Sequence, residues 1–325
     1  MIRLFGRGDS CYQTPIMRKT ALLFAGQGAQ KVGMGHELCQ NHEIARNLFA
    51  QADDILGYSL SSICFEGPEV DLTQTEHAQP GIYLTSWAAL AVLKQEVPNL
   101  QFEATAGLSL GEFTALAAAG ALSFADGLKI TRARGRFMQE ACDATAGGMA
   151  AIIGLDEGPT REVCEAAGVQ LANLNCPGQL VISGEKSGIE AACEAAKAAG
   201  AKRALPLPVA GAYHSRLMAS AQPSLRAELE AAGIQVPSVP VYSNVTAAPH
   251  GDPASILGLL VDQVTSSVLW EASIRAMLEQ GFTTFIELGP GTALTGFMKR
   301  ISRDVEVFNV EDAASLAKTV DALKA

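Results

Sequence analysis

The sequence has 325 residues, enough for one large domain or two ordinary ones. Apolar residues make up 48% and charged residues 18%, which provides a sizeable core and excludes a disordered chain. No stretch reaches the about 20 consecutive apolar residues of a membrane helix, so we expect no membrane-spanning segment. The net charge of −10 would repel a phosphate backbone, which argues against nucleic acid as a partner.

Two features bear on the cellular compartment. The seven cysteines form no C-x-x-C motif and are odd in number, which argues against a disulfide framework and favours a reducing, cytoplasmic compartment. Residues 1–19 are basic but lack the apolar run of a secretory signal. We favour a start assigned too far upstream, with this extension left out of the fold, and an organelle transit peptide is the alternative.

From residue 21 onward, predicted strands and helices alternate, which is typical of an α/β fold with a mainly parallel sheet. After the strand over 21–25, a glycine-rich turn opens a helical stretch that extends to about residue 56. The next predicted elements are a buried helix over 83–97, a strand over 104–108, and helices over 110–119 and 125–142.

Between about 147 and 209 the order becomes β-α-β-β-α-β, which is that of a ferredoxin-like unit. We therefore predict a small subdomain over 146–210, inserted into a large α/β subdomain made of 20–145 and 211–325. The second half of the large subdomain is predicted to contain helices over 217–232, 254–264 and 271–280, strands over 239–243 and 282–287, and a closing helix, strand and helix.

The strongest chemical signal is the G-x-S-x-G pattern of residues 107–111, placed where a predicted strand passes into a predicted helix. Such a turn strains the serine backbone, and the two glycines remove Cβ atoms that would clash. Ser109 then lies at the helix N-terminus, where the N–H of Leu110 can donate to an oxyanion. Because a five-residue pattern can occur by chance, the prediction of a nucleophile depends on its position between a predicted strand and a predicted helix.

A serine hydroxyl needs a base, and His214 is the best placed of the five histidines. It follows the last strand of the small unit, on a loop that returns to the large subdomain. His36 and His42 fall on an amphipathic helix, and His250 lies in a loop rich in proline and glycine. A packed, structural histidine is the alternative for His214. We expect the reaction rate to fall as this imidazole is protonated, near the ordinary histidine pKa of about 6.5.

Arg134 occupies an unusual position for a cation. On a helix, Arg132 and Arg136 share one face, whereas Arg134 shares the apolar face with Phe137 and Met138. A guanidinium buried there needs an anionic partner, and no local acid is suitably placed. A ligand carboxylate is our preferred partner, and a structural acid from elsewhere in the chain is the alternative.

The segment Gly26-Gln27-Gly28-Ala29-Gln30 follows the first predicted strand. It is not a dinucleotide fingerprint, because Lys31 stands where the third glycine should be, and no phosphate-loop pattern exists in the chain. Its backbone could supply a second oxyanion N–H, from Gln27, opposite that of Leu110.

Taken together, these segments resemble the malonyl-CoA:acyl-carrier-protein transacylases, the acyltransferases of type II fatty acid synthesis. The resemblance covers about residues 20–310, and the family fold combines a hydrolase-like α/β subdomain with a ferredoxin-like one. It is carried by six motifs in the same order, namely residues 24–30, 107–112, 134–139, 175–179, 211–214 and 287–291.

The resemblance implies a role for each matching residue. Ser109 matches the nucleophile that carries the malonyl ester, and His214 matches its base. Arg134 matches the arginine that binds the free malonyl carboxylate. Gln27 and Leu110 match the oxyanion-hole residues, and Gln263 matches a glutamine whose main-chain carbonyl orients the histidine, in a dyad without an acid.

The family also implies malonyl-CoA and an acyl carrier protein as partners, no metal or redox cofactor, and a monomer. Two positions depart from the common family pattern: Leu108 replaces a histidine and Tyr213 replaces a phenylalanine. Tyr213 keeps the aromatic bulk beside the malonyl α-carbon, so malonyl is still expected as the acyl group.

Other functions remain open at this point. A serine esterase or thioesterase would use water as the acceptor and would place an Asp or Glu behind the histidine. An acyltransferase with a different acyl donor would keep the dyad and change the pocket. An acyl-binding scaffold would carry an idle serine.

Overall fold

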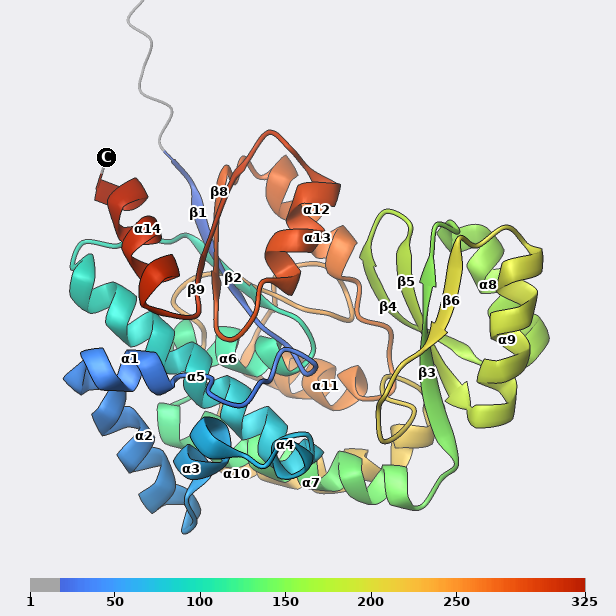
Figure 1. Ribbon diagram of the computed structural model, residues 1–325, viewed down its shortest axis with the longest axis horizontal. Helices are drawn as coiled ribbons and strands as arrows, with labels where there is room; N and C mark the ends of the chain where they lie inside the picture. Colours follow the sequence, from blue (N-terminus) through green and yellow to red (C-terminus); the bar gives the residue numbers. More distant parts are fainter. Residues whose placement is uncertain (1–17, 325) are drawn as a thin grey trace, which may run out of the picture.

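The structure, a computed structural model, describes residues 18–324. It has two parts, a large one built on a five-stranded sheet and a small one built on a four-stranded sheet (Figure 1). The predicted extension over 1–19 falls mostly outside the described residues. Its last residue, Lys19, accepts backbone hydrogen bonds from Thr283 and Thr284 at the start of a strand of the large sheet.

The large sheet is parallel throughout, with the strand order β7-β2-β1-β8-β9. This architecture confirms the predicted α/β class. Its strands are β1 (Thr20–Phe24), β2 (Ala104–Gly107), β7 (Val241–Tyr242), β8 (Thr284–Leu288) and β9 (Glu306–Val310).

The central strand β1 explains why the sheet is buried on both faces. Leu22 and Phe24 point to one face and Ala21 and Leu23 to the other, and none of the four is accessible to solvent. A strand covered on both faces has to be apolar at every position, which is why it appears in the sequence as an uninterrupted hydrophobic run.

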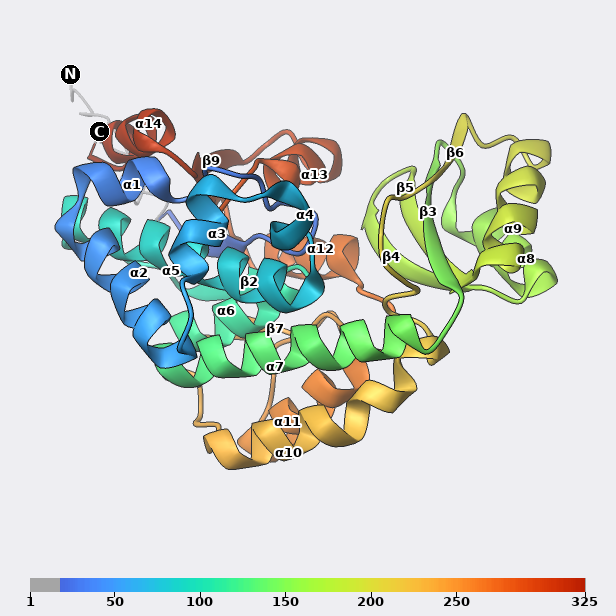
Figure 2. The same cartoon turned by 60° about the horizontal axis from the view of Figure 1, so that its bottom comes forward.

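Most helices cover the face of Leu22 and Phe24, whereas α12 and α13 contribute the core on the other face. Helix α7 crosses the large part, with α10 and α11 below it in Figure 2, and leads directly into β3 of the small sheet. The helices of the large part are α1 (His36–Asn41), α2 (Glu43–Leu56), α3 (Leu60–Glu66), α4 (Glu69–Leu72), α5 (Thr75–Glu96), α6 (Leu110–Ala118), α7 (Phe124–Asp143), η1 (Arg216–Ala221, a 3-10 helix), α10 (Gln222–Ala232), α11 (Pro253–Gln263), α12 (Trp270–Glu279), α13 (Ala293–Ile301) and α14 (Ala313–Lys324).

The small sheet is antiparallel, and its strand order β4-β5-β3-β6 is that of a ferredoxin-like unit, as predicted. Helices α8 and α9 pack on one face through a core of their own. The other face turns toward the large part, because Met149, Ala172 and Val181 join the large core. The elements are β3 (Gly147–Ile153), α8 (Glu157–Ala167), β4 (Gln170–Cys176), β5 (Gln179–Glu185), α9 (Lys186–Ala198) and β6 (Arg203–Pro206).

Three local predictions were wrong. The glycine-rich turn after β1 does not open a helix, since residues 25–35 form turns and the helix begins at His36 and breaks at His42. The buried helix begins at Thr75, eight residues before the predicted start, and it contains Pro80 in its interior, where the ring removes one backbone hydrogen bond. Helix 217–232 is divided into η1 and α10 at the pair Gln222-Pro223.

In the part of the chain that the structure describes, no helix combines the length and the apolar character that crossing a membrane requires.

Candidate active site

The turn between β2 and α6 places Ser109 at the carboxyl edge of the large sheet. Its backbone has φ 54° and ψ −103°, a conformation that L-residues rarely adopt. A Cβ on Gly107 would collide with the backbone of Gly111, and one on Gly111 would collide with the carbonyl of Phe24 in β1. The two glycines therefore allow the helix to begin directly against the sheet, with the serine at its start.

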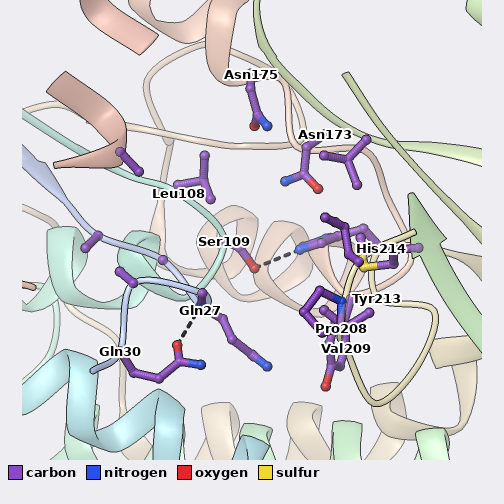
Figure 3. Close-up of a pocket in the computed structure, with 18 of the residues that line it drawn as sticks. Gln27, Gln30, Leu108, Ser109, Asn173, Asn175, Pro208, Val209, Tyr213 and His214 are labelled. Atoms are coloured by element: carbon purple, nitrogen blue, oxygen red, sulfur yellow. Dashed lines mark hydrogen bonds between the residues drawn. The ribbon is translucent and has the colours of Figure 1, made fainter. Parts of the chain in front are cut away.

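Ser109 and His214 lie within hydrogen-bonding distance although 105 residues separate them in sequence. The Ser109 Oγ is 2.7 Å from the His214 Nε2 (Figure 3). On its other side, the His214 Nδ1 lies 2.9 Å from the main-chain carbonyl of Gln263 and 3.2 Å from that of Ser266. Because a carbonyl can only accept, it places the ring proton on Nδ1 and leaves Nε2 free to take the serine proton.

Within residues 18–324, no carboxylate contacts the His214 ring, and both acceptors of its Nδ1 are backbone carbonyls. Burial, together with the positive charge of Arg134, lowers the pKa of His214 from 6.5 to about 4. The imidazole is therefore neutral over the whole physiological pH range. The expectation of a rate dependence near 6.5 treated this histidine as solvated, whereas it is 4% exposed.

Arg134 is buried, as its position on the apolar face of α7 predicts, while Arg132 and Arg136 are exposed. Its guanidinium donates to the Gln79 Oε1 at 2.8 Å, to the Gln263 Oε1 at 2.9 Å and to the Ser109 Oγ at 3.2 Å. None of these partners is charged, and the Arg134 Nε has no hydrogen-bond partner among the described residues.

Burial lowers the pKa of Arg134 to about 10, so the side chain stays cationic at neutral pH. The acid with the largest electrostatic effect on it is Glu112, a residue of α6 that forms no ion pair with it within 4.0 Å. The site thus holds an uncompensated cation beside the serine hydroxyl. Such an arrangement is suited to an anionic ligand group.

The backbone N–H groups of Gln27 and Leu110, the expected oxyanion donors, both lie on segments that line or adjoin the serine turn. Gln27 follows β1, and Leu110 is the first residue of α6. Gly26, next to Gln27, packs against the Leu108 carbonyl, which brings the loop after β1 beside the serine turn. Within the described chain, neither N–H donates to another protein group, so both are free to donate to a ligand.

A cavity of about 550 Å³ opens in front of Ser109 between the large and small parts (Figure 3). The loop after β1 lines one side, and the small sheet lines another through Asn173 and Asn175 of β4. Tyr213 also lines the cavity. Its hydroxyl is hydrogen-bonded to the Thr75 hydroxyl at 2.7 Å, so the ring presents mainly its aromatic surface to the cavity. The cavity is large enough for an elongated acyl ligand.

The sequence did not reveal four buried polar residues around the dyad: Gln79, Glu112, Asn244 and His250. Asn244 accepts from the Ser109 N–H at 2.6 Å and donates to the Gly107 carbonyl at 2.8 Å, which holds both ends of the serine turn. Two of the four left a signal in the sequence. Glu112 is the one charge in the apolar helix 110–118, and Asn244 follows the carboxyl end of a strand.

These features are those of a class of protein, the α/β acyltransferases, in which a serine hydroxyl at a strand–helix turn is hydrogen-bonded to a buried, neutral histidine. The sequence matches the acyl transferase domain family over residues 21–321, and the chain belongs to this family.

Among its curated relatives, the malonyl CoA-acyl carrier protein transacylase of Bacillus subtilis is 46% identical over 95% of this chain and 98% of its own length. The crystal structure of an acyl-carrier-protein S-malonyltransferase from Bartonella henselae superposes with a TM-score of 0.90, at 40% identity over 94% of this chain and 100% of that one. A malonyl-transacylase solved in complex with a type II PKS acyl-carrier protein gives a TM-score of 0.90, at 38% identity over 94% of this chain and 99% of that one.

Proposed function

We propose that the chain transfers a malonyl group from malonyl-CoA to the phosphopantetheine thiol of an acyl carrier protein, through a malonyl ester on Ser109. The observation that carries the proposal is the placement of the Ser109 Oγ, which is 2.7 Å from a neutral base and 3.2 Å from a buried guanidinium. The base serves acyl transfer in general, and the guanidinium selects an acyl group that ends in a carboxylate.

In the first half-reaction, the Ser109 Oγ attacks the thioester carbonyl while the His214 Nε2 takes its proton. The N–H groups of Gln27 and Leu110 stabilise the tetrahedral oxyanion, each by about 3 kcal/mol. The intermediate collapses to the malonyl ester, and the sulfur of coenzyme A leaves with the proton that His214 returns. The Gln263 carbonyl keeps the imidazolium oriented between the two proton transfers.

In the second half-reaction, the carrier-protein thiol gives its proton to His214 and its sulfur attacks the ester carbonyl. The same two N–H groups stabilise the second tetrahedral intermediate, and Ser109 is regenerated when His214 returns the proton to its Oγ. Throughout, the malonyl carboxylate is paired with Arg134, whose guanidinium is held by the Gln263 Oε1.

The proposed reaction needs no metal or redox cofactor, because it moves only protons and an acyl group. One chain supplies the base, the nucleophile and the guanidinium, so a monomer would suffice. The described cysteines are unpaired and buried, which favours a reducing compartment such as the cytoplasm. Sedimentation of the purified chain at micromolar concentration would test the monomer.

The proposal is tested by incubating the chain with malonyl-CoA and a carrier protein that carries its phosphopantetheine arm. We expect intact mass spectrometry to find malonyl-carrier protein, and the same carrier protein without the arm to gain no mass. Release of free malonate with no carrier-protein product would favour a hydrolase. The backbone acceptors of the His214 Nδ1 argue against that alternative, which would place a carboxylate there.

A further inference from the structure

The proposed mechanism leaves one buried titratable pair unused. Glu112 lies in the first turn of α6, three residues after Ser109, and His250 lies in the loop after β7. The Glu112 Oε1 is 2.7 Å from the His250 Nε2, and both side chains are completely inaccessible to solvent. Burying such a pair costs desolvation energy, which indicates a role beyond stability.

The second carboxylate oxygen connects this pair to the active site. The Glu112 Oε2 accepts from the Gln263 Nε2 at 2.6 Å and from the backbone N–H of Asn244 at 3.0 Å. Each oxygen of the carboxylate therefore has at least one partner. The contact with Gln263 is the shortest hydrogen bond that this amide forms.

The neighbours of the Gln263 amide determine which way it faces. On the side of its Nε2 lie three groups that accept: the Glu112 carboxylate, the Ser109 carbonyl at 3.0 Å and, at 3.5 Å, the Asn244 Oδ1. On the side of its Oε1 lies Arg134, which can only donate, at 2.9 Å. A rotated amide would place an N–H against the guanidinium and an oxygen against the carboxylate.

We propose that Glu112, held in place by His250, is a positioning residue that fixes the Gln263 amide and thereby aims Arg134 at the carboxylate of the acyl group. The inference rests on the proposed function, because it assigns Arg134 to that carboxylate. Glu112 contacts neither the dyad side chains nor the guanidinium, and Gln263 is the side chain that hydrogen-bonds both Glu112 and Arg134. The Glu112–His250 pair therefore influences which acyl donor the site prefers without contacting that donor.

The test compares malonyl-CoA and acetyl-CoA as donors, with kcat/KM measured for each. We expect Glu112→Met, which removes both acceptors, to lower the ratio of malonyl to acetyl kcat/KM by about tenfold. Glu112→Gln should keep most of the ratio, because its remaining oxygen can still accept from Gln263 and Asn244. Thr319→Val removes a buried hydrogen bond in α14, far from the site, and should leave the ratio unchanged.

A double-mutant cycle with Arg134→Ala provides the sharper test, because the proposed effect of Glu112 requires the guanidinium. Adding Glu112→Met to Arg134→Ala should cause no further change in the ratio. If Glu112→Met alone slows both donors equally, Glu112 has only a structural role and the inference is wrong. If Glu112→Met does not fold, His250→Met is the second variant: a smaller loss of the ratio is expected, and an unchanged ratio would contradict the inference.

The outcome also separates this inference from the proposed function. If the unmodified chain forms no malonyl ester and shows no preference for malonyl-CoA, the proposed function fails. If the unmodified chain prefers malonyl-CoA and the Glu112 variants leave that preference intact, only the inference about Glu112 fails.

Discussion

The two sides of the cavity differ in how their polar groups are bonded. On the side of the serine turn, which we call the elbow side, the polar groups of Ser109, His214 and Gln263 have protein partners and so does the guanidinium tip of Arg134. On the side of the small sheet, which we call the sheet side, the Asn175 Oδ1 is buried and has no hydrogen-bond partner within residues 18–324.

From this difference we infer that the elbow side fixes the geometry of the reacting groups, whereas the sheet side adjusts to the bound ligand. Chemistry at Ser109 requires atoms held within a few tenths of an ångström, and a network with most of its hydrogen bonds formed in advance provides that. On the sheet side, Asn175 lines the cavity and its amide oxygen is not held by the described chain, so the amide can reorient toward a ligand. We therefore expect substitutions on the elbow side to lower kcat strongly, and substitutions on the sheet side to raise KM modestly.

The largest effect is expected for Ser109→Ala. The nucleophile is lost while the fold is kept, since the side chain is at a turn and forms no part of the hydrophobic core. Turnover should fall to a trace and no acyl-enzyme should form, as measured by transfer of labelled malonyl groups. Ser187→Ala, at the exposed start of α9, is the matched control. Substantial turnover by the Ser109 variant would mean that another residue is the nucleophile.

His214→Ala should slow acylation by about 100- to 10,000-fold, the usual size of general-base assistance. Stopped-flow measurement of coenzyme A release gives this rate directly. The exposed His36 offers the control His36→Ala, which should behave as the unmodified chain does. An acylation rate within a few-fold of the unmodified chain would assign the base elsewhere.

Arg134→Ala breaks a buried charge pair with the substrate and should cost about 3–5 kcal/mol, which lowers kcat/KM for malonyl-CoA by several hundredfold or more. Acetyl-CoA has no carboxylate, so its weak turnover should change far less. Arg134→Lys should recover only part of the malonyl activity, because an ammonium cannot form the planar two-point contact.

Arg136→Ala is the control for that prediction, since Arg136 lies on the same helix and is exposed. Equal losses for both donors in Arg134→Ala would show that the arginine is structural. That outcome would also remove the contrast between the two sides of the cavity.

The dependence of acylation on pH should follow the lowered pKa of His214. Protonation inactivates the base, so kcat/KM should stay level from pH 8 to pH 6 and decline only as the pH approaches about 4. Between 6.5 and 4 the unfolded chain binds a proton at this histidine that the folded chain does not, so stability also falls over this range. A midpoint near 6.5 for the rate, with the fold intact, would mean that the histidine is solvated.

The smallest effect is expected on the sheet side. Asn175→Ala removes the unpartnered amide, and we expect KM for malonyl-CoA to rise by about three- to tenfold with kcat nearly unchanged, the size of one hydrogen bond to a ligand. The exposed Asn99 provides the control Asn99→Ala. A large fall in kcat with KM unchanged would place Asn175 among the residues that fix the reaction geometry.

The sequence predicted those parts of the site that depend on local backbone structure. Ser109 could be found because the two glycines and the serine form one short pattern, in which Gly107 is required by its contact with Gly111 inside the turn itself. Arg134 could be found because helical periodicity places it on an apolar face. Burial and position on one element were sufficient in both cases.

The residues that sequence analysis missed depend on contacts between distant segments. Glu112 meets His250 and Asn244 across more than 130 residues, and Gln79 meets Arg134 across 55. No local pattern encodes such pairs. The late start predicted for α5 has a different cause: proline is disfavoured inside a helix, so local propensity does not encode the turns around Pro80.

The central claim is that Ser109 carries the malonyl group, and the most direct measurement is a brief reaction of the chain with malonyl-CoA, an acid quench and peptide mass spectrometry. We expect a malonyl ester on Ser109 that disappears when carrier protein with its phosphopantetheine arm is added before the quench. A malonyl group on another residue, or an unmodified Ser109 peptide while malonyl-carrier protein accumulates, would contradict the account.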